Sequence, residues 1–100
     1  MTQRSGLQGL NTNVCLDIEN ERYTQMLLYG TEEDLVNKHG IKAYLDRKMV
    51  ILMEETGELA KDINDMNEKG MYNEAIQTAA VAQAICEGID YFLKTKLGVK

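Results

Sequence analysis

Residues 51–63 read ILMEETGELAKDI and residues 72–93 read YNEAIQTAAVAQAICEGIDYFL, and these two stretches decide the fold. In both, apolar residues recur every three or four positions, which is typical of an α-helix that packs against other helices. The chain contains no Pro, so no residue forces either helix to stop early. We therefore predict an all-α protein, a helical hairpin or bundle, in which these two helices pack together.

The apolar pattern predicts three helices, over residues 14–28, 42–67 and 72–97. Gly70 follows the second of them and is predicted to be its C-terminal cap. Residues 30–40 have loop signals at both ends, and Thr31 is expected to cap a short turn there. Residues 1–13 are polar and predict a flexible N-terminal tail. The remaining residues 14–100 are predicted to form one helical domain.

The last helix is apolar around most of its circumference. One stripe, at alternating spacings of four and three, consists of Ala75, Ala79, Ala82, Cys86, Ile89 and Leu93. Further apolar residues lie beyond that stripe, and a helix of this kind is buried on several sides. Because a chain of 100 residues with three helices has little surface to provide such cover, we predict a homo-oligomer, a dimer or a tetramer, with this helix at its centre.

Composition excludes several classes of function. The net charge of −5 argues against nonspecific nucleic-acid binding, which depends on Lys and Arg neutralising phosphates. No segment approaches the roughly 20 apolar residues that span a bilayer. The polar start lacks the apolar stretch of a signal peptide, so we expect a cytoplasmic location. Cys15 and Cys86 have no metal-binding spacing, and His39 is the only histidine, so a zinc site is not expected.

Acidic residues gather on the predicted hairpin. Glu54, Glu55 and Glu58 form an E-E-x-x-E group, Asp62 follows one turn later, and Glu74 lies beyond a short break. Carboxylates three or four residues apart share a helix face, where their mutual repulsion destabilises the helix. A hard divalent cation with oxygen ligands removes this repulsion, and Mg²⁺ is usual where the ligand carries phosphates. The sequence therefore predicts a metal-dependent phosphate site.

These segments resemble the MazG-like family of all-α nucleotide pyrophosphohydrolases. Residues 54–59, EETGEL, are similar to the E-E-x-x-E group of that family, and residues 74–77, EAIQ, stand in the place of its E-x-x-D group. Residues 17–30, DIENERYTQMLLYG, are similar to the D-I-x-x-E-R-x-x-Q-x-x-x-W-G opening of small, often phage-encoded members, with Tyr29 where Trp is common. A further similarity lies in IQTAAVAQAICEGID, and the resemblance covers roughly residues 14–95.

The resemblance implies a fold of the all-α NTP pyrophosphatase type. It also implies Mg²⁺-dependent hydrolysis, with Mn²⁺ as an alternative ion, of a nucleoside triphosphate to a nucleoside monophosphate and pyrophosphate. The implied catalytic residues are Glu54, Glu55 and Glu58. The implied metal ligands are Glu55, Glu58, Glu74 and Gln77. The residues expected to contact the nucleotide are Arg22, Gln25, Tyr29, Lys48 and Lys61.

Simpler interpretations of the same residues stay open. A run of charge on a helix is usually a solvated face, with Lys48 and Lys61 as partners of Glu58 and of the acids beside Glu55. Arg22 is equally explained by a surface ion pair with Glu19 or Glu21. Tyr23 and Tyr29 are better explained by packing in a core or an interface. The second E-x-x-D sequence, from Glu87 to Asp90, is predicted to lie on the surface or between subunits.

Gln77 departs from the family pattern, because many relatives have a metal-binding Asp at that place. An amide oxygen can coordinate a metal ion but adds no negative charge. Two functions follow: an enzyme that tolerates Gln77, or a protein that binds or sequesters a nucleotide without cleaving it. A phage protein that sequesters a nucleotide signal, acting in the host cytoplasm, is one form of the second. A purely structural helical oligomer is the third hypothesis.

Overall fold

A computed structural model describes residues 11–98, and these residues form four α-helices. In chain order the helices are α1 (Thr12–Tyr29), α2 (Glu32–His39), α3 (Ile41–Asn64) and α4 (Glu68–Lys96). The all-α prediction is therefore confirmed. Most of the predicted flexible tail, residues 1–10, lies outside the described residues. The first helix begins at Thr12, two residues earlier than predicted.

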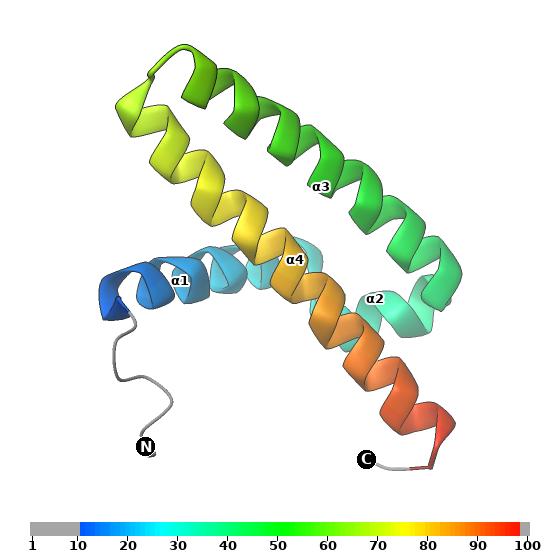
Figure 1. The fold of residues 1–100 in the computed structure, drawn as a ribbon. Helices are drawn as coiled ribbons and strands as arrows, with labels where there is room; N and C mark the ends of the chain where they lie inside the picture. Colours follow the sequence, from blue (N-terminus) through cyan, green and yellow to red (C-terminus); the bar gives the residue numbers. More distant parts are fainter. Residues whose placement is uncertain (1–10, 99–100) are drawn as a thin grey trace, which may run out of the picture.

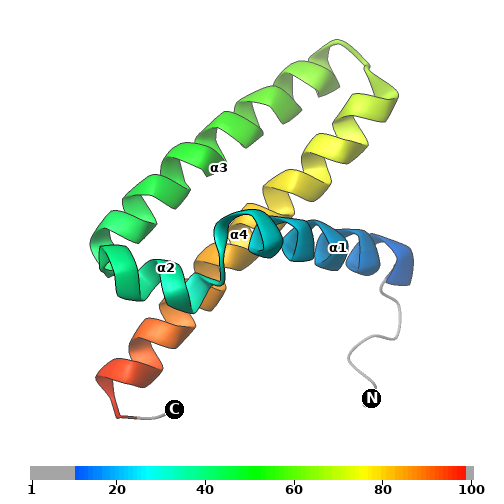
Figure 2. The same cartoon turned by 180° about the vertical axis from the view of Figure 1, so that it is seen from behind.

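The two longest helices, α3 and α4, run antiparallel as a hairpin (Figure 1). Helix α1 crosses α4 near its middle, and α2 contacts both α3 and α4, as the view from behind also shows (Figure 2). The molecule measures 46 × 38 × 21 Å along its principal axes. Because one helix with its side chains is about 10 Å across, the molecule is only two helices thick. No helix in this arrangement can be covered on every side.

Capping residues determine where α1 and α2 begin. The Asn11 side chain accepts a hydrogen bond from the Val14 amide, and the Thr31 side chain accepts one from the Asp34 amide, each at 3.1 Å. The predicted cap at Thr31 is thus confirmed. The short turn predicted after Thr31 is longer than expected, because residues 32–39 form the two-turn helix α2. Acidic residues fill its first turn and basic residues its last, which favours the helix electrostatically.

The turn between α3 and α4 lies earlier than predicted. Helix α3 ends at Asn64, and Met66 adopts a positive φ of 55° that takes the chain out of the helix. The Asn67 side chain then accepts a hydrogen bond from the Gly70 amide at 3.2 Å and caps α4. The residues NEKG therefore begin the last helix, and Gly70 lies in its first turn and not at the end of α3.

The core lies where α2, α3 and α4 meet. Its buried apolar residues are Val36, Tyr44, Ala80, Val81 and Ala84. The Tyr44 hydroxyl has two hydrogen-bond acceptors for its single proton, the Ala84 carbonyl at 2.8 Å and the Glu32 carboxylate. Gly88 allows this close approach, because a Cβ atom there would overlap the Tyr44 ring. No large side chain among residues 11–98 is fully buried.

A large apolar surface remains exposed on the single chain. Most of the stripe predicted to lie at the centre of an oligomer is exposed: Ala75, Ala82, Cys86, Ile89 and Leu93. Helix α3 also exposes Met49, Val50 and Met53. A single copy of the chain therefore leaves uncovered the residues whose pattern indicated burial. No helix within residues 11–98 combines the length and hydropathy required to cross a lipid bilayer.

Candidate functional site

Three acidic side chains meet across the hairpin. Glu55 and Glu58 come from neighbouring turns of α3, and Glu74 comes from α4. Each provides a carboxylate oxygen, and these oxygens all lie within 4.8 Å of one another. The antiparallel packing of α3 and α4 places Glu74 opposite the other two. The structure thus brings together three of the four residues predicted as metal ligands, which we call the acidic cluster.

The acidic cluster is electrostatically strained. Burial, a hydrogen bond with Glu58, and the nearby charges of Glu55, Glu58 and Asp62 raise the pKa of Glu74 to about 7. Burial and the charges of Glu58, Glu21 and Glu54 likewise raise the pKa of Glu55. In addition, the Oε2 atom of Glu74 is buried and has no hydrogen-bond partner among the described residues. A cation between these carboxylates would relieve both the repulsion and the missing contact.

The donor set of the acidic cluster fits a hard divalent cation. Mg²⁺ prefers oxygen ligands and is commonly held by one or two carboxylates, together with water and ligand phosphates. The Glu74 Oε2 atom, which has no hydrogen-bond partner among the described residues, is free to coordinate such a cation. The remaining predicted residues lie nearby in the chain: Gln77 is three residues after Glu74 and partly buried, and Glu54 precedes Glu55 and is exposed. Neither belongs to the three-carboxylate group.

A groove of about 800 Å³ lies beside the acidic cluster. Its lining residues come from α1, α2 and α3, together with Val81 of α4. Three of the residues predicted to contact a nucleotide line it: Gln25, Tyr29 and Lys48. Glu55 also lines it, so one residue belongs both to the acidic cluster and to the groove. The volume falls within the range of small-molecule pockets.

Two of the residues predicted to contact phosphate, Arg22 and Lys48, form ion pairs with a buried carboxylate. Glu32, only 6% exposed, lies 3.5 Å from the Arg22 guanidinium and 3.4 Å from the Lys48 ammonium. It also accepts a hydrogen bond from the Tyr44 hydroxyl, and the Lys48 ammonium lies 5.5 Å from the centre of the Tyr44 ring. Within the described chain, Glu32 therefore forms ion pairs with two of the three cations predicted to contact phosphate.

Arg22 makes further contacts, and its ion-pair partners differ from the predicted ones. It pairs with Glu87 at 2.5 Å and donates a hydrogen bond to the Gln25 side chain at 3.2 Å. The expected partners on the same helix, Glu19 and Glu21, do not pair with it among residues 11–98. Glu87 lies partly on the surface, at 47% exposure, as predicted. Its role is to hold Arg22 from α4, across 65 residues of sequence.

Lys61 and Tyr29 are both strongly exposed. The Lys61 ammonium pairs with Asp65 at 3.1 Å, and its side chain is 76% exposed. Lys61 therefore forms an ion pair on a solvated face, but its partner is Asp65 and not the predicted acids near Glu55 and Glu58. Tyr29 is 68% exposed and Tyr23 is 61% exposed, so neither packs in the core of the single chain. Tyr29 borders the groove and is accessible from it.

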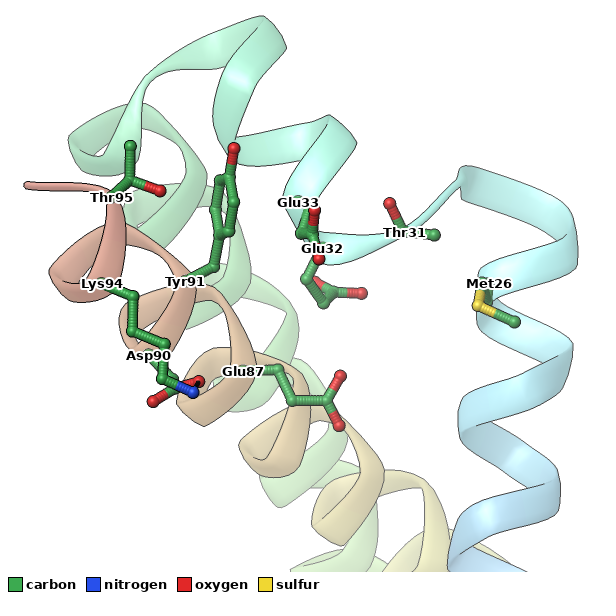
Figure 3. Close-up of a pocket in the computed structure, with 9 residues that line it drawn as sticks. All are labelled: Met26, Thr31, Glu32, Glu33, Glu87, Asp90, Tyr91, Lys94 and Thr95. Carbon is green, nitrogen blue, oxygen red and sulfur yellow. Dashed lines mark ion pairs between the residues drawn. The ribbon is translucent and has the colours of Figure 1, made fainter. Parts of the chain in front are cut away.

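A second groove, of about 600 Å³, lies between the start of α2 and the C-terminal half of α4. Figure 3 shows Glu32 and Glu87 pointing into the space between these elements. Asp90 and Lys94 form an ion pair at 2.9 Å along its α4 wall. The lining contains no member of the acidic cluster. Glu32 lines both grooves.

Sequence reasoning did not single out Glu32, Tyr44 or Arg47. An acid after a helix cap is usually interpreted as a favourable charge on the helix end, and Tyr44 precedes the acidic run without any motif. Helical spacing was the signal in the sequence that could have placed Tyr44 near the site. Tyr44, Lys48 and Glu55 lie at intervals of four and seven, so they share one face of α3. Comparison of the chain with protein-family models, curated proteins and solved structures gave no match.

Proposed function

We propose that this chain is a Mg²⁺-dependent nucleoside triphosphate pyrophosphohydrolase of the MazG-like type. The observation that carries the proposal is the position of Glu55, which belongs both to the acidic cluster and to the wall of the groove. A nucleotide lying in the groove would therefore have its phosphates beside the residues that hold the metal. Mn²⁺ is expected to substitute for Mg²⁺, because it also prefers oxygen ligands.

Each residue has a distinct part in this proposal. Glu55, Glu58 and Glu74 would hold the cation, which supplies positive charge to the phosphate oxygens and activates a water molecule. Glu54, next to the acidic cluster, would orient that water or add a ligand. Gln25 would hydrogen bond to the nucleotide, and the exposed ring of Tyr29 at the groove edge would stack on the base. The partly buried Gln77 could add a neutral amide oxygen to the metal site.

A second candidate is a protein that binds a nucleotide without cleaving it. Two observations favour it. Gln77 supplies no negative charge where the resembling family usually has an Asp, and Arg22 and Lys48 already form ion pairs with Glu32 and Glu87. Both features reduce the electrostatic stabilisation available to a transition state. Neither removes the acidic cluster or the groove, which would be enough for binding.

We further propose that the working form is a homo-oligomer, a dimer or a tetramer. No large side chain among residues 11–98 is fully buried, and the α4 stripe of small and apolar residues is exposed. A second copy packed on that stripe would give the core the cover that a slab two helices thick lacks. Sedimentation equilibrium of the full chain tests this, and a monomer at all concentrations would refute it.

The decisive experiment measures pyrophosphate release from a panel of nucleoside triphosphates, with Mg²⁺ or with chelator. Nucleotide retained by the protein is measured in the same samples. Glu58→Gln should abolish metal-dependent release, whereas Glu19→Gln, an exposed acid on α1, is the matched control and should not. Retention of nucleotide without release would favour the binding protein. Neither release nor retention would refute both functions.

A further inference from the structure

Arg47 is the cation of the groove that no described carboxylate neutralises. It lines the groove, its side chain is exposed, and no ion pair joins it to another residue within 11–98. Lys48, which follows it, is bound to Glu32 and is only 14% exposed. His39 also lines the groove. Of the arginine and lysine side chains that line the groove, Arg47 is therefore the one with no carboxylate partner within residues 11–98.

Arg47 shares a helix face with the acidic cluster. Residues 47, 51, 54 and 58 are spaced by four, three and four along α3, which places them on one stripe of the helix. Ile51, between Arg47 and the acidic residues, also lines the groove. Glu55 is eight residues after Arg47, or about 12 Å of helix rise. The groove thus has an acidic end that fits a cation and a basic position two turns away.

This arrangement suits a ligand that carries more than one anionic group. A group beside Glu55 would be held through the cation in the acidic cluster. A second anionic group, farther along the groove, needs a positive partner from the protein, and the long Arg47 side chain can extend part of the way toward it. Guanidinium also matches phosphate geometry better than ammonium does, because it donates two parallel hydrogen bonds.

We infer that Arg47 binds a second phosphate of the ligand, whose charge the cation in the acidic cluster does not fully neutralise. Arg47 thereby selects oligophosphates over monophosphates. This inference rests on the proposed nucleotide function and deepens it. Arg47 is a binding residue here, and it does not contribute to the metal site. Arg47 is exposed and forms no ion pair among the described residues, so its replacement should leave the fold intact.

The test compares Arg47→Gln and Arg47→Lys with wild type and with Lys42→Gln. Lys42 lies on the same helix and is 84% exposed, where it pairs with Asp46, so its replacement makes the same charge change outside the groove. Calorimetric titration in Mg²⁺ measures affinity for four nucleoside triphosphates, for their monophosphates and for inorganic tripolyphosphate. Mn²⁺ binding without nucleotide is measured separately, and circular dichroism checks folding.

We expect Arg47→Gln to weaken triphosphate and tripolyphosphate binding about 10- to 100-fold, the effect of one charge-assisted hydrogen-bonding group. Monophosphate affinity and Mn²⁺ binding should stay within about threefold of wild type, and Arg47→Lys should fall between the two. Lys42→Gln should resemble wild type. Unchanged triphosphate affinity in Arg47→Gln, or equal losses for mono- and triphosphates, would overturn the inference while leaving the proposed function intact. Absence of nucleotide binding by wild type would overturn the proposed function itself.

Discussion

Replacing Glu74 with Gln tests the electrostatic strain in the acidic cluster. The ordinary pKa of a Glu is 4.5, and burial with the neighbouring acids raises the pKa of Glu74 to about 7 in the folded protein. The folded state therefore binds a proton more tightly than the unfolded state. By linkage, the contribution of Glu74 to stability is greatest below about pH 4.5 and is lost as the pH rises through about 7.

The size of this effect follows from the two pKa values. The difference between 4.5 and about 7 corresponds to about 3 kcal/mol. Because Glu74 is only partly buried, water screens part of the repulsion, and we expect about 1–2 kcal/mol. The neutral amide of Glu74→Gln does not carry this penalty. Without metal at about pH 8, the free energy of unfolding of the variant should therefore exceed that of wild type by about 1–2 kcal/mol. Each kcal/mol corresponds to a rise of about 4–8 °C in Tm.

The assay is thermal unfolding by circular dichroism over the range from about pH 4.5 to about pH 8, in chelator. Other carboxylates also titrate in this range, so the difference between variant and wild type isolates Glu74. That difference should be small at low pH and should grow through neutrality. Mg²⁺ at about pH 8 should stabilise wild type and not Glu74→Gln, because the cation removes the same repulsion.

The control for this prediction is Glu19→Gln, which removes an exposed acid that has no ion pair among the described residues. It should leave the stability difference from wild type close to zero at every pH. The reasoning would be refuted if Glu74→Gln were no more stable than wild type at about pH 8. A difference that did not change with pH would refute it as well, since titration of Glu74 is the stated cause.

Gly88→Ala should destabilise the protein by about 1–3 kcal/mol, because the added methyl overlaps the Tyr44 ring, and urea denaturation will measure the change. Glu32→Gln should cost about 3–5 kcal/mol in the same measurement, since it leaves the partly buried Lys48 without its counter-charge and Arg22 with Glu87 alone; an unchanged midpoint would exclude a structural role for Glu32. Gln77→Asp should raise Mg²⁺-dependent pyrophosphate release if the chain is a weakened enzyme, and no increase would favour the binding protein.

Much of the secondary structure could be predicted from the sequence. The helical periodicity of α3 and α4 and the cap at Thr31 depend on residues within one or two turns, so they can be seen without knowing the fold. The turn before α4 was misplaced because Asn67 and Gly70 can each end a helix or begin one. The side-chain cap from Asn67 to the Gly70 amide decides between these alternatives.

The candidate site was only partly predictable. That Glu55 and Glu58 share a helix face follows from their spacing of three. The partners of Arg22 did not follow, because Glu32 and Glu87 come from α2 and α4, ten and 65 residues away in the chain. Sequence reasoning searches for ion pairs within a helix, whereas the pairs here form between helices. The function itself stays a prediction, drawn from resemblance and geometry.

By itself, the sequence determined that the chain is helical and that acids crowd one face of α3. These properties are local, since helix geometry alone places residues three or four apart on the same side. Only the tertiary structure decided that Glu74 completes the acidic cluster, that Glu55 also borders a groove, and that Arg47 rather than Lys48 remains available. Those properties depend on how α1, α2 and α4 pack around α3, because contacts between helices join residues far apart in the chain.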